Sequence, residues 1–138
     1  WRNELPTAEP VRTILLTHWV EWAERFATVT PGLWRARVSL LDWCGVPIVA
    51  MPGEIFSETG LSVRSAVPDR PAFVLAYAES NPGYIPPASE YRFGGYEVSE
   101  AHRFIGMPGA FAPGSAEALA EAARTLLQQR HLTAQPVA

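Results

Sequence analysis

The sequence predicts an α/β fold built on a small mixed sheet with covering helices. Two observations carry this prediction: short apolar segments typical of strands alternate with amphipathic segments typical of helices, and both recur along the 138 residues. Apolar residues make up 48% and charged residues 18% of the chain, which is an ordinary globular composition. So few strands would leave sheet edges exposed, which indicates that an upstream segment or a partner chain completes the sheet.

The N-terminal third is predicted to hold one long helix and the first strand. Helical spacing of apolar side chains predicts a helix over residues 8–27, with Thr7 as its N-cap. Alternating apolar and polar side chains then predict a strand over residues 34–40. The apolar run at residues 46–51 predicts a second strand, and the two strands could pair as a hairpin through residues 44–45.

The remainder of the chain repeats the strand and helix pattern without a linker that would divide it into domains. Residues 53–63 are expected to form a helix with Glu54 in its first turn, and residues 71–78 an apolar strand. Residues 79–98 are rich in proline and glycine and predict a long loop, which in a compact domain often has a function. A last helix is predicted over residues 115–131, followed by a frayed tail.

Charge and cysteine content exclude several classes of protein. The net charge is −3 and no basic patch is visible, so nucleic-acid binding is not expected. No apolar run is long enough for a transmembrane segment. Cys44 is the only cysteine, which excludes an internal disulfide and a multi-cysteine zinc site, and its apolar neighbours predict a buried, inert thiol. All basic residues are arginine, a composition typical of GC-rich bacterial genomes, and it leaves the cellular location open.

Glu54 is the first candidate for chemistry. It follows the buried strand at residues 46–51, and in open α/β sheets ligands bind beyond the carboxyl ends of the strands. A carboxylate at the start of a helix is also favoured by the helix dipole alone. Taken by itself, Glu54 fits this second, purely structural interpretation better.

Three tyrosines in the long loop are the next candidates. Tyr84 follows the strand at residues 71–78 on a segment stiffened by prolines, and Tyr91 and Tyr96 come soon after. Each one alone is more often a half-buried packing residue with a hydrogen-bonded hydroxyl. Tyr96, for example, could simply pack over the turn formed by the two glycines that precede it.

The order and spacing of these motifs resemble a known family. PGEIFSETGL at residues 52–61, then an apolar strand, NPGYIP at residues 81–86 and GGYEV at residues 94–98 resemble the C-terminal part of the catalytic domain in neutral/alkaline non-lysosomal ceramidases. The bacterial ceramidase-like branch of the family is the most similar. The resemblance covers about residues 33–130, and its motifs are loose individually but fairly specific together.

The resemblance implies a zinc-dependent amide hydrolase that is incomplete in this chain. It implies that Glu54 and Tyr84 are zinc ligands, that two histidine ligands lie upstream of this chain, and that Tyr96 polarises the substrate carbonyl. Tyr96 stands 12 residues beyond Tyr84, the separation that the family leads us to expect. Zinc lowers the pKa of its bound water to roughly 7 and so supplies a nucleophile for an N-acyl amide. Residues 55–57 depart from the threonine-rich family pattern, so the substrate is expected to be ceramide-like or another lipid-like amide.

The three histidines are not expected to bind this metal. No two of them have the spacing of metal ligands on a helix. His18 lies on the apolar stripe of the first helix and is predicted to be a core or interface residue. His102 is predicted to lie at the surface. His131 ends the last helix, where a cation complements the dipole.

Two other functions remain open at this point. The chain could be a ceramidase-like interaction module that binds a partner chain and has no catalytic activity. Histidines with metal spacing in the upstream region would distinguish the enzyme from the module. An N-terminal-nucleophile hydrolase is a third class, and Trp1 argues against it because that mechanism needs Ser, Thr or Cys at the first position.

Overall fold

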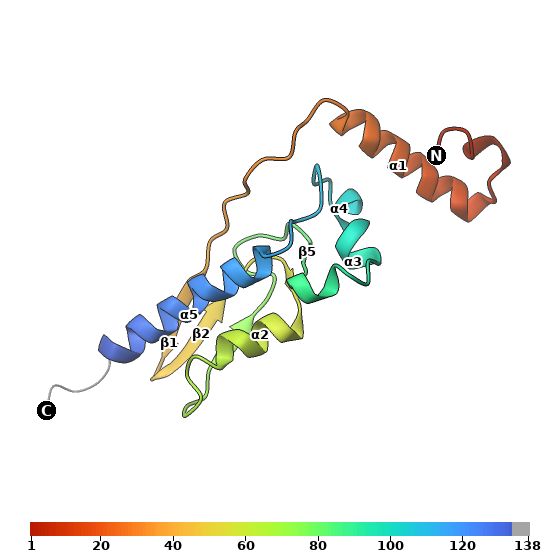
Figure 1. The fold of residues 1–138 in the computed structure, drawn as a ribbon. Coiled ribbons are helices and arrows are strands. Elements are labelled where there is room, and N and C mark those ends of the chain that lie inside the picture. The colour runs from red at the N-terminus through yellow and green to blue at the C-terminus, as the bar shows by residue number, and fades with distance from the viewer. Residues whose placement is uncertain (134–138) are drawn as a thin grey trace, which may run out of the picture.

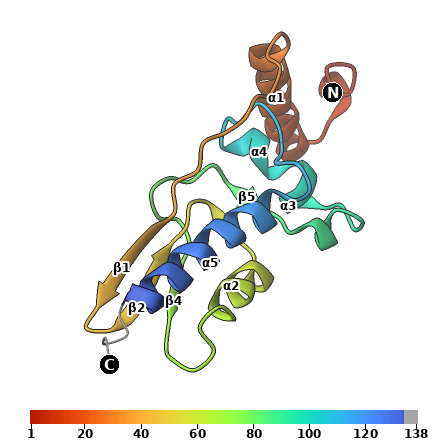
Figure 2. The ribbon, with the colours of Figure 1, turned by 60° about the vertical axis from the view of Figure 1, so that its left-hand side comes forward.

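A small mixed sheet covered by helices on one face forms the body of the structure (Figures 1 and 2). The computed structural model describes the backbone of residues 1–133 and the side chains of residues 1–130. The predicted tail beyond the last helix, and the side chain of His131, lie outside the described residues. In chain order the elements are η1 (Leu5–Thr7), α1 (Pro10–Phe26), β1 (Ser39–Trp43), β2 (Val46–Ala50), β3 (Glu54–Ile55), α2 (Ser57–Arg64), β4 (Phe73–Leu75), β5 (Tyr84–Ile85), η2 (Ala88–Glu90), α3 (Tyr96–Ser99), α4 (Ala101–Phe104) and α5 (Ser115–Thr133).

The main sheet has the order β1-β2-β4 and is mixed, as predicted. Strands β1 and β2 form an antiparallel hairpin in which Trp43 pairs with Val46, and β4 runs parallel to β2. The turn residues Cys44 and Gly45 both have positive φ, 53° and 85°, which is the geometry that matches the twist of a two-residue hairpin. The prediction of a buried Cys44 is therefore wrong: its thiol is exposed, because the tip of a hairpin projects beyond the sheet.

The first strand begins later than predicted. Residues 34–38 are irregular, and β1 starts only at Ser39. Trp34 and Val38 pack against the core from this extended segment, and the Trp34 ring lies 5.5 Å from that of Phe111. The alternation that predicted a strand thus reflects a segment whose apolar side chains face the core without ladder hydrogen bonds to a neighbouring strand.

The chain around Glu54 also differs from the prediction. Helix α2 starts at Ser57, so Glu54 is not in a helical turn. Instead Glu54 lies in β3, which pairs in parallel with β5 of the predicted loop, as a second, two-stranded sheet. Tyr84, the pairing partner of Glu54, is 30 positions away in sequence, so the local pattern of apolar residues could not predict this pairing.

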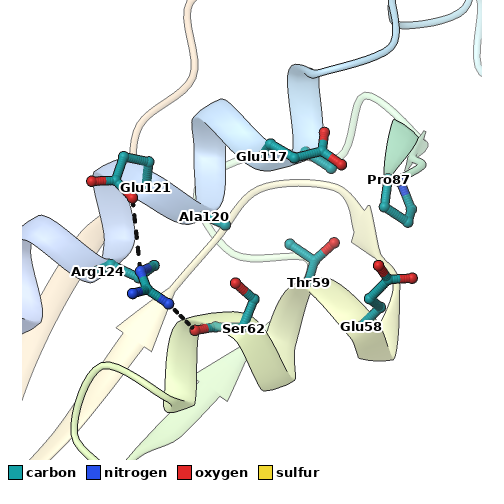
Figure 3. A pocket seen from close by; sticks show the side chains of 9 residues that line it. Glu58, Thr59, Ser62, Pro87, Glu117, Ala120, Glu121 and Arg124 are labelled. Atoms are coloured by element: carbon teal, nitrogen blue, oxygen red, sulfur yellow. Dashed lines mark hydrogen bonds and ion pairs between the residues drawn. The ribbon is translucent and has the colours of Figure 1, made fainter. Parts of the chain in front are cut away.

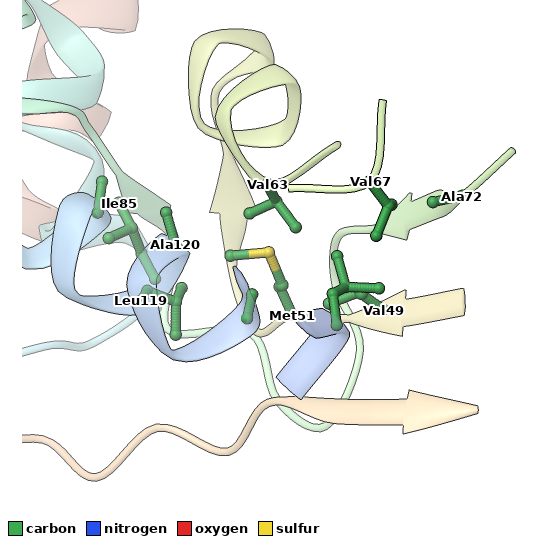
Figure 4. Packing of buried hydrophobic residues seen from close by; sticks show 11 residues of the cluster. Val49, Met51, Val63, Val67, Ala72, Ile85, Leu119 and Ala120 are labelled. Carbon is green, nitrogen blue, oxygen red and sulfur yellow. The ribbon is translucent and has the colours of Figure 1, made fainter. Parts of the chain in front are cut away.

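One hydrophobic core joins the main sheet to the two helices above it. Val49 and Met51 from β2 and its end, Val63 from α2, and Leu119 and Leu127 from α5 are all buried (Figure 4). Apolar positions of α2 and α5 recur at helical spacing, so each helix presents one stripe to the sheet. The core therefore fixes the carboxyl end of β2, from which the chain continues directly to Glu54.

Helix α1 packs away from this core, at the end of the molecule where α4 lies (Figures 1 and 2). It begins at Pro10 with Glu9 as its N-cap, and Thr7 belongs to η1, so Thr7 is not the predicted cap. His18 is half-buried against α4, as expected of a residue on the apolar stripe: its ring stacks on Phe104 at 5.3 Å. None of the described helices is long and apolar enough to cross a bilayer.

Candidate metal and catalytic site

Two glycines bring the ends of the strands together beneath the candidate site. The amide of Gly53 donates to the carbonyl of Ser80 at 2.9 Å, and the amide of Glu54 donates to the carbonyl of Gly83 at 2.8 Å. Gly53 has φ +73°, and a Cβ atom at this position would lie 2.7 Å from the carbonyl oxygen of Gly83. Only glycine permits both the left-handed conformation and this close approach of two backbones.

Glu54 and Tyr84, the two predicted zinc ligands, lie side by side. They are register partners in the parallel pair of β3 and β5, which places both side chains on the same face of the ladder. A side-chain hydrogen bond to the Glu54 carboxylate, followed by burial, raises the pKa of Tyr84 to about 12. The phenol of Tyr84 is therefore a proton donor to the carboxylate at neutral pH.

Tyr77 is a third member of this group, and the sequence interpretation missed it. Its hydroxyl donates to Oε2 of Glu54 at 2.8 Å, and this hydrogen bond raises the pKa of Tyr77. The apolar pattern at residues 71–78 placed Tyr77 inside a strand, whereas β4 ends at Leu75. The position of Tyr77 after a strand could have identified it. Strand β4 runs parallel to β2, so residues just beyond the two strands meet at one edge of the sheet.

Tyr96, the predicted catalytic residue, stands next to Tyr84. Their ring centroids are 6.1 Å apart at an interplanar angle of 76°, an edge-to-face contact. Tyr96 is the first residue of α3 and follows Gly95, whose φ is +101°. Tyr96 is 46% exposed, so part of this residue lies at the surface.

Tyr91, which also lies in the segment predicted to be a loop, has a different role. Its hydroxyl donates to the carbonyl of Phe111 at 2.7 Å, and burial raises the pKa of Tyr91. This is the packing arrangement expected of a half-buried tyrosine. Tyr91 thus provides an internal comparison for the tyrosines that cluster around Glu54.

The described histidines make structural contacts. Nε2 of His18 lies 3.1 Å from the carbonyl oxygen of Arg103. His102 packs edge-on against Trp22 at 5.3 Å, and burial together with the neighbouring Arg103 lowers the pKa of His102. His102 is half-buried, which corrects the predicted surface position; the reason is that α4 packs this ring against α1.

A metal would find two oxygen donors here, and further ligands would have to come from elsewhere. Glu54 and Tyr84 are register partners with their side chains on one face, so their two oxygens can approach one cation once the phenol proton leaves. Zinc in proteins usually has three or four protein ligands, from nitrogen, sulfur or oxygen. Among the described residues no group of three or more His, Cys, Asp or Glu side chains could hold a metal. The residues therefore fit one part of a zinc site.

An apolar groove borders strand β5. It has a volume of about 910 Å³ and lies between the extended segment at residues 31–38, residues 107–112 and α5. Ile85, the residue after Tyr84, is part of its wall together with Trp34, Phe111 and Leu119. Successive side chains of a strand point to opposite faces, so the groove that Ile85 lines lies on the other face of β5 from the side chain of Tyr84.

A second hollow, of about 260 Å³, lies between α2 and α5 and is polar (Figure 3). Its charged side chains have partners within the chain. Arg124 donates to the carbonyl of Ser62 at 2.9 Å and lies 3.7 Å from Glu121, and Glu117 accepts a hydrogen bond from the amide of Ala88 at 2.8 Å. These contacts connect α5 to α2 and to η2, which is a structural role.

No protein-family model, curated protein or solved structure matches the chain. The roles of Glu54, Tyr84 and Tyr96 implied by the ceramidase resemblance therefore remain predictions. The proximity of these side chains is, in contrast, a property of the fold. Glu54 and Tyr84 are register partners, and the rings of Tyr84 and Tyr96 are in contact. The geometry of this group is the basis on which a function can be argued.

Proposed function

We propose that the chain is part of a zinc-dependent hydrolase that cleaves the amide bond of an N-acyl, ceramide-like or other lipid-like substrate. The observation that carries the proposal is the pairing of Glu54 with Tyr84 across β3 and β5, with the ring of Tyr96 against that of Tyr84. A carboxylate and a phenol on one face of a strand pair, beside a second phenol, supply two metal ligands and one hydrogen-bond donor. Each of these groups has a task in amide hydrolysis.

The tasks follow from the chemistry of the side chains. Glu54 and Tyr84 would hold zinc through oxygen, and Tyr84, whose pKa is raised to about 12 without a metal, would bind it as the deprotonated phenolate. Bound zinc supplies a nucleophile from water by lowering its pKa to about 7, and it polarises a carbonyl. Tyr96 would donate a hydrogen bond to the substrate carbonyl oxygen, and this bond strengthens as negative charge develops there.

The apolar groove supports an acyl chain as part of the substrate. Its wall is built mainly from apolar side chains and includes Ile85, the residue that follows Tyr84 in β5. A hydrocarbon chain in such a groove leaves water and contributes binding free energy in proportion to the apolar area buried. We assign the groove to the acyl chain and the cluster of Glu54, Tyr84 and Tyr96 to the amide.

The uncovered face of the main sheet supports a further polypeptide layer. Leu41, Ile48 and Phe73 form one row across the three strands, and Trp43 and Leu75 lie on the same face. Phe73 is 56% exposed and Trp43 is 67% exposed. Parallel strand pairs are normally covered on both faces. We propose that an upstream segment or a separate N-terminal chain of the same protein covers this face and brings two histidine ligands to Glu54 and Tyr84.

The same uncovered face favours the alternative function, a non-catalytic module that binds a partner chain. The alternative requires the apolar sheet face but makes no use of Glu54, Tyr84 or Tyr96. The two functions therefore differ in what substitutions of these three residues do.

The test compares zinc content and catalytic rate in variants of the complete protein. Glu54→Ala and Tyr84→Phe are expected to reduce bound zinc, measured by elemental analysis, more than they reduce folding stability. Tyr96→Phe is expected to keep its zinc and to lower kcat on an N-acyl amide by about 10²–10³-fold, the usual cost of one oxyanion donor.

Glu58→Ala is the matched control, because Glu58 is an exposed carboxylate four positions from Glu54 that accepts a hydrogen bond from the hydroxyl of Ser89. It should retain both zinc and activity. Full zinc occupancy in Glu54→Ala and Tyr84→Phe would contradict the ligand assignment. A folded protein without zinc or amidase activity would favour the binding module.

A further inference from the structure

Tyr77 adopts a backbone conformation that is uncommon for a tyrosine. Its φ is +59°, in the left-handed region, where a bulky side chain is a genuine outlier. Two hydrogen bonds to the chain before Glu54 hold it there: the amide of Tyr77 donates to the carbonyl of Gly53 at 2.9 Å, and the amide of Ala78 donates to that of Met51 at 3.1 Å. Strained residues persist where the surroundings determine them, and they cluster at functional sites.

Packing does not explain why a large side chain occupies this position. The side chain of Tyr77 is 60% exposed, so its ring contributes little to the core. Its specific contact is the hydrogen bond from its hydroxyl to Oε2 of Glu54 at 2.8 Å. The backbone of Tyr77 is thus fastened to the turn that precedes Glu54, and its hydroxyl is fastened to the Glu54 carboxylate itself.

We propose that Tyr77 is a positioning residue that holds the Glu54 carboxylate in place for binding a metal ion. The proposal rests on the proposed function, because it takes Glu54 to be a metal ligand. A hydrogen bond to one carboxylate oxygen restricts rotation of the Glu54 side chain before a cation arrives, which lowers the entropy cost of binding. Hydrogen-bond partners of metal-ligating carboxylates orient the ligand in the same way in other sites.

Zinc affinity of the complete protein, measured by competition with a chromophoric chelator, tests this role. Tyr77→Phe keeps the ring and removes only the hydroxyl, so we expect zinc to bind about 10–100-fold more weakly, as for other partners of metal ligands. Tyr91→Phe is the matched control, because it removes a tyrosine hydrogen bond of similar length that ends on the carbonyl of Phe111. It should leave zinc affinity unchanged.

A second variant separates positioning from a role in folding. Asparagine is well tolerated at positive φ, so Tyr77→Asn should preserve the melting temperature of the zinc-free protein while its short side chain cannot reach Glu54. We expect zinc affinity to fall in this variant as in Tyr77→Phe. Wild-type zinc affinity in Tyr77→Phe, with loss of zinc in Glu54→Ala, would overturn the role of Tyr77 alone. Undiminished zinc binding in Glu54→Ala would overturn the ligand assignment and the proposed function with it.

Discussion

The environment of a single carboxylate organises the candidate site at the scale of residues. Glu54 accepts a hydrogen bond from the hydroxyl of Tyr77 and raises the pKa of Tyr84, and these two phenols come from different segments of the chain. Negative charge on Glu54 favours the protonated form of both phenols. A cation that takes the place of the Tyr84 proton would reverse this preference, which makes the proton on Tyr84 a measurable reporter of the site.

We predict that stability at high pH depends on Tyr84. The folded protein raises the pKa of Tyr84 to about 12, above its ordinary value of 10.0, so the folded state binds this proton more tightly than the unfolded state does. The resulting stabilisation is fully present below pH 10 and is lost as pH rises through 12. In urea denaturation of the zinc-free protein, the free energy of unfolding should therefore fall more steeply between pH 9 and 11 in the wild type than in Tyr84→Phe. Parallel curves for the two proteins would show that Glu54 does not hold this proton.

The candidate residues were only partly predictable from the sequence. Glu54 and Tyr84 each follow an apolar segment, and the rule that ligands bind beyond strand ends brought both forward. Tyr77 obeys the same rule but continues an apolar run, so nothing local marked the end of β4 at Leu75. The hydrogen bond from Tyr77 to Glu54 spans 23 positions and depends on a positive φ that the sequence does not reveal.

At the scale of elements, tight turns determine which strands meet. The hairpin of β1 and β2 was predictable because it is local, with its turn at residues 44–45 between two apolar runs. The pair of β3 and β5 was not, because it joins two-residue strands that are distant in sequence. Gly53 allows that pairing by permitting a close approach of its backbone to the carbonyl of Gly83, and Gly83 leaves room for the side chain of Ile105.

We predict that Gly53→Ala is more damaging than Gly45→Ala. Both glycines have positive φ, so an alanine at either position costs about 1–2 kcal/mol in backbone conformation. A Cβ atom on Gly45 meets nothing within 4 Å, whereas one on Gly53 lies 2.7 Å from a backbone oxygen that has little room to move. Chemical denaturation of the complete protein should show an additional loss of about 1–3 kcal/mol for Gly53→Ala, the range of an overpacked site. Equal losses for the two variants would show that this backbone contact relaxes freely.

At the scale of the whole molecule, the predicted class of fold is confirmed in its coarse form. The structure is mixed α/β with a three-stranded mixed sheet and covering helices. Length and composition were sufficient for this, because amphipathic helices and apolar strands of these lengths can bury their faces only against one another. The sequence does not determine what lies on the other face of the sheet, since an exposed apolar residue and one covered by a separate segment look the same in a single chain.

The last prediction concerns that uncovered face. If another segment or chain covers it, Phe73→Thr should lower the free energy of unfolding of the complete protein by about 2–4 kcal/mol, as for the loss of a buried aromatic ring. In residues 1–138 alone, where Phe73 is 56% exposed, the same change should leave thermal denaturation nearly unchanged, because surface substitutions usually have little effect. The chain alone should also self-associate and melt without cooperativity, because the apolar row of Leu41, Ile48 and Phe73 remains in contact with water. Analytical ultracentrifugation and thermal denaturation measure both properties. A monomeric chain with a cooperative melt, together with an equal and small effect of Phe73→Thr in both contexts, would show that this face needs no cover.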